Sequence, residues 1–328
     1  MGERTVHTNG VDLHVTEDGE GSPVILCHGF PELGYSWRHQ VPALAAAGYH
    51  VVAPDQRGYG QSSKPEAIDQ YDIVHLTDDL LGLLDDLGHE KAVFIGHDWG
   101  SMVVWGMSLL HPDRVAGVMG MSVPFIPRGD RPPTESMRFL FGDAFFYMLY
   151  FQEPGVADAN LAADPARTMR GMLAGLAMDN MADGDLDPGA MFAADDRGFV
   201  ERLPNPKSLP AWLSQDELDH YVAEFARTGF TGGINWYRNL DRNWEALAGT
   251  EGDKVQPPAA FLGGAQDPVL MMTPPAVMEG WLADDRGSLL VDGAGHWVQQ
   301  EQPGAVSRLL VQFLGEANTK AKANQGAA

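Results

Sequence analysis

The stretch Gly96-His97-Asp98-Trp99-Gly100 decides how the rest of the chain is interpreted. It follows the apolar run Lys91–Ile95, which is typical of a buried strand, and it precedes the helical pattern of Ser101–Leu110. Small residues two positions before and two positions after a central residue allow a sharp strand-to-helix turn that lifts the central side chain above the sheet. Asp98 occupies the central position and is therefore predicted to be a nucleophile. An aspartate that only caps the following helix would also fit this turn.

Apolar runs and helical patterns alternate through the first 125 residues and again after residue 244. This alternation favours a mostly parallel sheet with helices on both faces. Asn9-Gly10 predicts a hairpin between the first two strands. The expected strands are Arg4–Thr8, Val11–Thr16, Pro23–Cys27, Tyr49–Ala53, Lys91–Ile95, Val115–Ser122, Ala259–Leu262 and Ser288–Val291. The expected helices are one that ends at Ala47, Ile73–Leu87, Ser101–Leu110, one near Pro275–Leu282, and Gly304–Leu314.

The alternation stops between residues 126 and 244, where no apolar strand run occurs and helix formers, aromatic residues and methionines are frequent. We predict that this segment is a helical cap inserted into the sheet domain. The core is then formed by residues 1–125 and 245–315. The last residues, 316–328, have no apolar face and are expected to be disordered.

Two further residues complete a catalytic pattern with Asp98. In proteins with this turn, the nucleophile, an acid and a histidine follow one another in that order along the chain. Asp267 comes after the expected strand Ala259–Leu262, and His296 comes after Ser288–Val291. Ligands bind beyond the carboxyl ends of strands in open α/β sheets, so the three side chains are expected at one edge. Order and placement together predict a triad of Asp98, Asp267 and His296.

The motif His28-Gly29-Phe30-Pro31 directly follows the expected strand Pro23–Cys27. A covalent mechanism needs backbone N–H donors directed at the position where negative charge develops. We predict that the backbone amides of Phe30 and of Trp99, the residue after the nucleophile, form this oxyanion hole.

Together with these motifs, three longer segments resemble the α/β-hydrolase superfamily and, within it, the soluble epoxide hydrolases. They are Asp55-Gln56-Arg57-Gly58-Tyr59-Gly60-Gln61-Ser62, Tyr147-Met148-Leu149-Tyr150-Phe151-Gln152-Glu153-Pro154-Gly155 and Asn235-Trp236-Tyr237-Arg238-Asn239. The resemblance covers nearly the whole chain. It implies an α/β-hydrolase fold with a mostly parallel eight-stranded sheet, helices on both faces and an inserted helical cap domain.

An aspartate nucleophile indicates which bonds the protein breaks. A carboxylate attacks saturated carbon and forms an alkyl ester with its own side chain, and water then attacks the carbonyl carbon of that ester. The substrate is therefore expected to be an epoxide or an alkyl halide. Ester and amide hydrolysis are disfavoured because the sequence contains no intact Gly-x-Ser-x-Gly motif.

Opening an epoxide produces an alkoxide, which is more basic than a phenolate, so a tyrosine hydroxyl can protonate it. The resemblance to epoxide hydrolases implies that Tyr147 and Tyr237 are these acids and that they bind the substrate together with Phe30 and Trp99. Tyr150, one helical turn after Tyr147, is the alternative to it. The methionines and aromatic residues of the cap favour an apolar small-molecule epoxide of some bulk.

The expected reaction converts this epoxide and water to a vicinal diol. After Asp98 has opened the ring, His296, oriented by Asp267, removes a proton from the water that attacks the ester. Glu32 either holds this water or forms a surface salt bridge. His97 is interpreted as a structural hydrogen-bonding residue rather than as a second base.

Two other functions fit parts of the sequence. A haloalkane dehalogenase would share Asp98 and Trp99, but binding of the halide usually needs a second donor from Asn or Trp. Position 30 is Phe, and that function leaves the tyrosine pair unexplained. A binding protein without catalytic activity on the same scaffold would be expected to lack a member of the triad, whereas all three residues are present.

Composition excludes several classes of protein. The 328 residues carry a formal charge of −23, which repels nucleic acids and anionic membrane surfaces. A single cysteine, Cys27, excludes a disulfide framework. The acidic stretch Asp183–Asp187 is no calcium loop, because Pro188 stands at the sixth position, where glycine is needed, and Ala194 at the twelfth, where glutamate is needed. We expect no metal and no cofactor. The N-terminal residues show no secretory signal, so the protein is expected to be cytoplasmic. It is expected to be a monomer or a homodimer.

Overall fold

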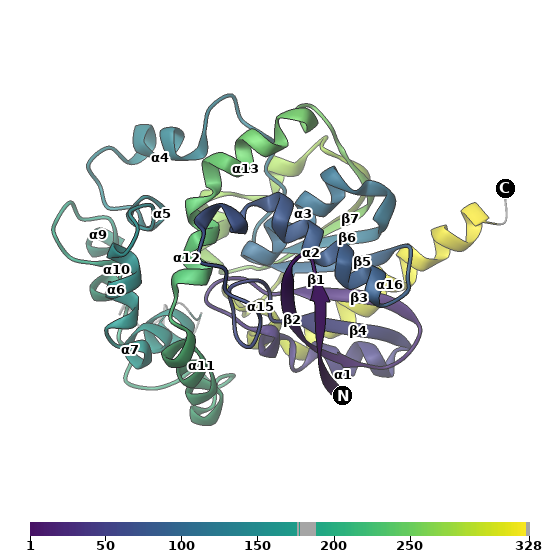
Figure 1. The fold of residues 1–328 in the computed structure, drawn as a ribbon, viewed down its shortest axis with the longest axis horizontal. Coiled ribbons are helices and arrows are strands. Elements are labelled where there is room, and N and C mark those ends of the chain that lie inside the picture. Colours follow the sequence, from purple (N-terminus) through teal and green to yellow (C-terminus); the bar gives the residue numbers. More distant parts are fainter. Residues whose placement is uncertain (176, 178–187, 326–328) are drawn as a thin grey trace.

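The computed structural model describes residues 1–175, 177 and 188–325. Its centre is an eight-stranded sheet in the order β1-β2-β4-β3-β5-β6-β7-β8 (Figure 1). β2 is antiparallel to both of its neighbours, and all other adjacent pairs are parallel, which confirms the predicted sheet. The strands are β1 (Gly2–Thr8), β2 (Val11–Asp18), β3 (Ser22–Cys27), β4 (Tyr49–Pro54), β5 (Ala92–His97), β6 (Val115–Met121), β7 (Val255–Gly264) and β8 (Leu282–Val291).

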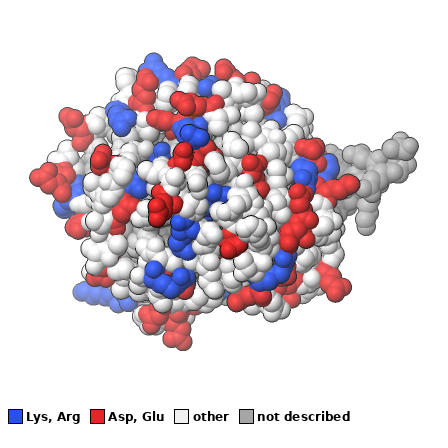
Figure 2. Space-filling view, viewed as in Figure 1, with Lys and Arg blue, Asp and Glu red and all other residues white. Residues whose placement is uncertain are grey.

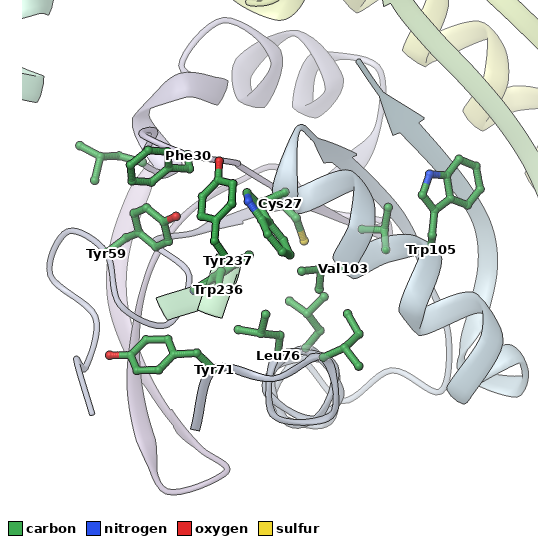
Figure 3. Close-up of a cluster of buried hydrophobic side chains, with 14 of the residues drawn as sticks. Cys27, Phe30, Tyr59, Tyr71, Leu76, Val103, Trp105, Trp236 and Tyr237 are labelled. Carbon is green, nitrogen blue, oxygen red and sulfur yellow. The ribbon is translucent and has the colours of Figure 1, made fainter. Parts of the chain in front are cut away.

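Helices cover both faces of the sheet because its central strands bear apolar side chains on both sides. On β3, Ile25 and Cys27 belong to the hydrophobic cluster shared with α2 and α3, part of which is drawn in Figure 3. The alternate residues Val24 and Leu26 belong to the cluster shared with α1 and α16. These helices are α1 (Gln40–Ala46), α2 (Ile73–Asp86), α3 (Trp99–Leu110) and α16 (Pro303–Gln325).

A helical insertion, residues 126–244, leaves the sheet after β6 and returns before β7, and it lies on the left in Figure 1. Its described residues form helices and no strand. Aromatic rings join it to the core: the ring centroid of Phe151 lies 5.9 Å from that of Phe30. Its helices are α4 (Pro133–Phe141), α5 (Tyr147–Tyr150), α6 (Val156–Ala162), α7 (Pro165–Met169), the π-helical turn η4 (Arg170–Ala174), α9 (Pro188–Met191), α10 (Phe199–Arg202), α11 (Gln215–Thr228), α12 (Thr231–Arg238) and α13 (Leu240–Ala246), which extends just past the insertion.

The region after β7 differs from the prediction in one helix. The helix expected near Pro275–Leu282 is only the 3₁₀ turn η6 (Pro275–Met278). Gly280 follows it with a φ of 82°, a left-handed conformation that ends helical structure, and Leu282 already begins β8. A short helix that was not predicted, α14 (Pro268–Met272), stands before this turn.

The C-terminal segment also differs from the prediction. Residues 316–325, expected to be disordered, continue α16 as a helix. Ala and Lys are good helix formers, so this segment has helical propensity even though it lacks an apolar stripe. The acidic stretch Asp183–Asp187 lies outside the described residues.

Acidic side chains dominate the charged surface, as the formal charge of −23 requires, but basic side chains are interspersed among them on the face shown in Figure 2. Among the residues that the structure describes, no helix combines the length and the apolar character needed to cross a bilayer.

Candidate active site

Asp98 stands at the turn between β5 and α3 with a backbone φ of 53°. This conformation is unfavourable for a residue with a Cβ, so its surroundings must hold it in place. A Cβ at Gly96 would collide with the carbonyl oxygen of Gly100, and a Cβ at Gly100 would collide with that of Cys27. The two glycines therefore allow strand, turn and helix to approach closely enough to raise the Asp98 side chain out of the sheet.

The Asp98 carboxylate is directed away from its own helix. Its side chain makes no capping hydrogen bond to α3, so the interpretation as a helix cap is wrong. Oδ1 accepts a hydrogen bond from the Phe30 N–H at 2.8 Å, and Oδ2 lies 3.6 Å from His296 Nε2. Trp99 is the first residue of α3, and its N–H belongs to the donors that a helix leaves without an internal partner. The two predicted oxyanion donors thus adjoin the carboxylate, one in space and one in sequence.

His296 lies between two carboxylates, since its Nδ1 is 3.1 Å from Asp267 Oδ2 and its Nε2 faces Asp98. Burial alone lowers the pKa of this imidazole, but the charges and hydrogen bonds of Asp267 and then Asp98 outweigh burial and raise the pKa well above its usual value. Burial alone raises the pKa of the Asp267 carboxyl. The charge of His296 and hydrogen bonds from His296 and the Val269 N–H outweigh this and lower the pKa. The structure therefore brings the three predicted triad residues together.

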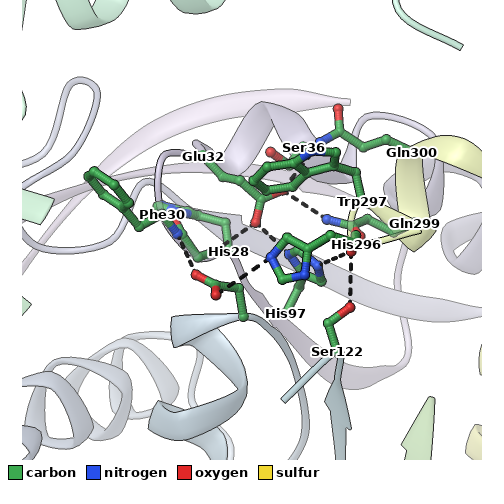
Figure 4. Close-up of polar contacts among 12 residues, drawn as sticks. His28, Phe30, Glu32, Ser36, His97, Ser122, His296, Trp297, Gln299 and Gln300 are labelled. Carbon is green, nitrogen blue, oxygen red and sulfur yellow. Dashed lines mark hydrogen bonds and ion pairs between the residues drawn. The ribbon is translucent and has the colours of Figure 1, made fainter. Parts of the chain in front are cut away.

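A second carboxylate–histidine pair lies next to His296, and the ring centroid of its histidine, His97, is 4.9 Å from that of His296 (Figure 4). His97 Nδ1 is 2.6 Å from Glu32 Oε2, and His97 Nε2 is 2.7 Å from the main-chain oxygen of His296. Burial alone raises the pKa of Glu32. The charge of His97 and the hydrogen bonds that Glu32 accepts from His97 and from the Gly29 N–H outweigh burial and lower this pKa to about 2. A carbonyl oxygen only accepts hydrogen bonds, so His97 Nε2 donates to the main-chain oxygen of His296.

Neither Glu32 nor His97 has any solvent exposure, so the surface salt bridge considered for Glu32 is wrong. The pair instead holds the main chain of His296 in place through the hydrogen bond from His97 Nε2 to its carbonyl oxygen. This role agrees with the interpretation of His97 as a structural hydrogen-bonding residue.

Sequence reasoning missed three residues that support this pair and His296. Gln299 and Gln300 donate to Glu32 Oε1 at 2.9 and 3.2 Å. Ser122 donates from Oγ to the main-chain oxygen of His296 at 3.0 Å and has a φ of 63°. The polar dipeptide three residues after His296 was the available signal for the glutamines, but a polar residue on a short helix is usually exposed.

The insertion contributes two tyrosines near Asp98. The ring of Tyr237, on α12, lies 5.5 Å from the Phe30 ring, measured between centroids (Figure 3). The Tyr237 ring centroid also lies 4.9 Å from that of the Trp99 indole. The ring of Tyr147, on α5, lies 5.8 Å from that of Tyr237. Burial raises the pKa of both phenols, and the negative charge of Asp98 acts in the same direction. Both hydroxyls are therefore protonated at neutral pH.

The alternative tyrosine, Tyr150, has different surroundings. Its ring contacts Phe145 at 5.3 Å, and its pKa is raised by partial burial and by Glu201, with Arg202 opposing. Asp98 is not among the groups that shift this pKa, whereas it shifts that of Tyr147. The Tyr147 ring, in contrast, lies 5.8 Å from the Tyr237 ring, and this contact favours Tyr147 as the partner of Tyr237.

Comparison with known proteins places the chain in a family. Residues 22–303 match the family model described as the alpha/beta hydrolase fold. Epoxide hydrolase A of Mycobacterium tuberculosis is 59% identical over 315 residues, covering 95% of this chain and 97% of that protein. An epoxide hydrolase of Caballeronia sordidicola is 41% identical and covers 95% and 93%, respectively.

Solved structures agree with these relatives. The crystal structure of Epoxide Hydrolase A from Mycobacterium thermoresistibile is 59% identical, with a TM-score of 0.90 over 95% of this chain and 98% of that one. An epoxide hydrolase from an endophytic Streptomyces superposes with a TM-score of 0.93 at 41% identity, over 97% and 96% of the two chains. The chain therefore belongs to the α/β hydrolases and, among them, to the epoxide hydrolase family.

Proposed function

We propose that the protein hydrolyses an apolar epoxide to a vicinal diol through a covalent ester on Asp98. The observation that carries this proposal is the unequal environment of the two Asp98 oxygens. Oδ1 is held by the Phe30 N–H, whereas Oδ2 faces His296 and is free to attack a carbon atom. Oδ1 then becomes the carbonyl oxygen of the ester, already in contact with an amide that stabilises negative charge on it.

In the first step, Asp98 Oδ2 bonds to one ring carbon of the epoxide, and the bond between that carbon and the ring oxygen breaks. The ring oxygen takes a proton from the pair of Tyr147 and Tyr237. The raised pKa of both phenols keeps them protonated until this point, and an alkoxide is basic enough to deprotonate them. A halide leaves as a stable anion and needs no such acid, so the tyrosine pair favours an epoxide over an alkyl halide.

In the second step, His296 removes a proton from water, which attacks the ester carbonyl carbon. Formation of the ester neutralises Asp98, and this removes one of the two negative charges that raise the pKa of His296. The imidazolium then gives its proton to the phenolate left by the first step and, now neutral, can act as the general base. The bond from the carbonyl carbon to Oδ2 breaks, the diol leaves with that oxygen and with the proton of the new Asp98 carboxyl group, and His296 keeps the proton that it took from water.

Glu32 and His97 support this step through the main chain. His97 donates to the carbonyl oxygen of His296, and Glu32 holds His97 in the orientation that this bond requires. Their hydrogen bonds leave neither side chain directed at the ester, so we infer that they position the base rather than act on the water.

The side chains around Asp98 support an apolar substrate. The Phe30 ring packs edge-on against Tyr237 and Phe151, with centroids 5.5 and 5.9 Å away, and the Trp99 ring contacts Tyr237. These rings provide apolar surface and almost no hydrogen-bonding groups besides the tyrosine hydroxyls and the Trp99 indole N–H. A charged substrate would lose its hydration here without compensation.

A single turnover in heavy-oxygen water tests the covalent route. Excess enzyme is mixed with an apolar aryl epoxide, and mass spectrometry locates the label. The label is expected in the Asp98 carboxylate and absent from the first diol formed. Direct incorporation of label into that diol would show that water attacks the epoxide itself, and the covalent route would be wrong.

A further inference from the structure

Tyr147 is carried by a very short helix. α5 spans only Tyr147–Tyr150, its N-terminal residue Phe146 makes no side-chain cap, and none of the four helical residues is fully buried. A single helical turn has little stability of its own, so contacts to neighbouring elements must fix it. The position of the Tyr147 hydroxyl therefore depends on what holds α5.

Gln152 makes such a contact to both tyrosine-bearing helices. Its Nε2 donates to the main-chain oxygen of Met148 at 2.8 Å and to the main-chain oxygen of Tyr237 at 2.9 Å. Met148 is the neighbour of Tyr147 on α5, and Tyr237 lies on α12. One amide group thus spans the two helices at the residues that carry, or adjoin, the two phenols.

We propose that Gln152 is a positioning residue that sets the distance between the hydroxyls of Tyr147 and Tyr237. This inference rests on the proposed function, in which both hydroxyls must reach one ring oxygen. A primary amide suits the role because its two N–H bonds reach two carbonyl oxygens at once. A carboxylate offers only acceptors and repels both carbonyls, and an apolar side chain leaves both without this partner.

A second contact between the same segments holds them further from the phenols. The Arg238 guanidinium donates to the main-chain oxygens of Phe151 and Glu153 and pairs with Asp158. This contact keeps the segment after α5 attached to α12 when Gln152 is changed. Loss of Gln152 is therefore expected to shift the phenols without detaching α5.

The variant Gln152→Met tests the role, since methionine has a similar length and no donor. Alkylation of Asp98 and hydrolysis of the ester are measured separately by rapid mixing in single turnovers. Alkylation is expected to slow about tenfold, because small misplacements of a reacting group cost rate steeply, while hydrolysis stays within about twofold. Gln152→Glu is the second variant, for use if Gln152→Met does not fold, and it is expected to slow alkylation at least as much.

Asn160→Ala is the matched control. Asn160 joins α6 to α10 within the insertion by donating to Glu201 and accepting from the Val200 N–H, and neither of these helices carries a tyrosine of the pair. It removes a comparable polar contact, and both rate constants are expected to remain unchanged. If alkylation slows as much in Asn160→Ala as in Gln152→Met, the loss of any polar contact in the insertion has the same effect. That result would overturn the inference.

A double-mutant cycle with Tyr147→Phe separates positioning from other causes. If Gln152 acts through the tyrosine pair, Gln152→Met is expected to slow alkylation less than twofold once the Tyr147 hydroxyl is absent. A full additional tenfold loss would contradict this role. Unchanged alkylation in Gln152→Met, with slow alkylation in Tyr147→Phe, overturns this inference alone. Unchanged alkylation in both Tyr147→Phe and Tyr237→Phe overturns the acid role in the proposed function and this inference with it.

Discussion

The sheet and the helical insertion hold their parts of the site in different ways. Asp98, Asp267 and His296 each follow a strand of one sheet, so the hydrogen-bonded backbone fixes where their side chains begin. Tyr147 and Tyr237 stand on helices of four and eight residues, and the described contacts between these helices are made by side chains. The proposed nucleophile is thus placed by the fold itself, and the proposed acids by tertiary contacts that a single substitution can alter.

Removal of the proposed nucleophile is expected to have the largest effect on activity. Asp98→Ala is expected to reduce turnover of an epoxide by about 10⁴-fold or more, since no other group can form the ester. Loss of the epoxide is followed by chromatography, and circular dichroism checks that the fold is retained. Substantial turnover by a folded Asp98→Ala protein would mean that the core does not supply the nucleophile.

Removal of the proposed base, His296, is expected to affect only the second step. His296→Gln is expected to alkylate Asp98 but to reduce steady-state turnover by about 10³-fold, since general base catalysis contributes 10²–10⁴. Intact-protein mass spectrometry should show the enzyme with one added substrate mass. If this variant stays unmodified while turnover is lost, His296 is needed before the ester forms, and the division of steps is wrong.

Removal of one phenol from the insertion should have a smaller effect and act on the other step. Tyr237→Phe and Tyr147→Phe are each expected to slow alkylation by about 10²-fold, because the remaining hydroxyl can still donate a proton. Hydrolysis of the ester should stay within a few fold of its normal rate. Stopped-flow tryptophan fluorescence in single turnovers separates the steps, and Tyr150→Phe, which keeps both phenols of the pair, is the control.

The two regions should also differ in how they respond to acid. Glu32 in the core and Asp195 in the insertion both have a pKa lowered to about 2, the first against the cost of burial through His97 and the second through hydrogen bonds from the exposed Arg197. A carboxyl whose pKa is lowered in the folded state stabilises it above the unfolded pKa and loses this effect as pH falls. The stability that Glu32 contributes is therefore lost as the pH falls from about 4.5 to about 2. The free energy of unfolding decreases by at most about 3 kcal/mol over this range.

Urea unfolding at pH 7 and pH 3 measures this difference. The free energy of unfolding of Glu32→Gln is expected to change less between the two pH values than that of the wild type, because the variant lacks the titrating carboxyl. Asp195→Asn should change the pH dependence less than Glu32→Gln does, because Asp195 is exposed and water screens its ion pairs with Arg197 and Arg202. Equal pH dependence in all three proteins would contradict a buried, ionised Glu32.

The parts of the molecule that follow from local sequence were predictable. Apolar runs marked the strands, and the glycines at positions 96 and 100 marked the turn that raises Asp98. The positions of Asp267 and His296 followed from the strands before them. In each case the signal lies within a few residues of the feature that it predicts, so no knowledge of distant contacts was needed.

The parts that depend on distant contacts were not predictable. Glu32 and His97 are 65 residues apart, and nothing in either segment indicates that they form a buried pair. Gln152 and Tyr237 are 85 residues apart. Nothing in the sequence around a glutamine next to a short helix indicates that its amide joins that helix to another one. The prediction of a helix near Pro275–Leu282 was wrong for another reason. The apolar residues have helical spacing, but Gly280 ends the helical turn and Leu282 belongs to β8.

One feature of the chain path bears on how this protein can change over evolution. The insertion lies between β6 and β7, which are parallel neighbours in the sheet, so all of it belongs to one crossover connection. A segment confined to one connection can be lengthened, shortened or exchanged without altering the order of the strands. Descendants of such a gene can therefore acquire new substrate preferences by recombination within this segment while inheriting the bond-making machinery intact.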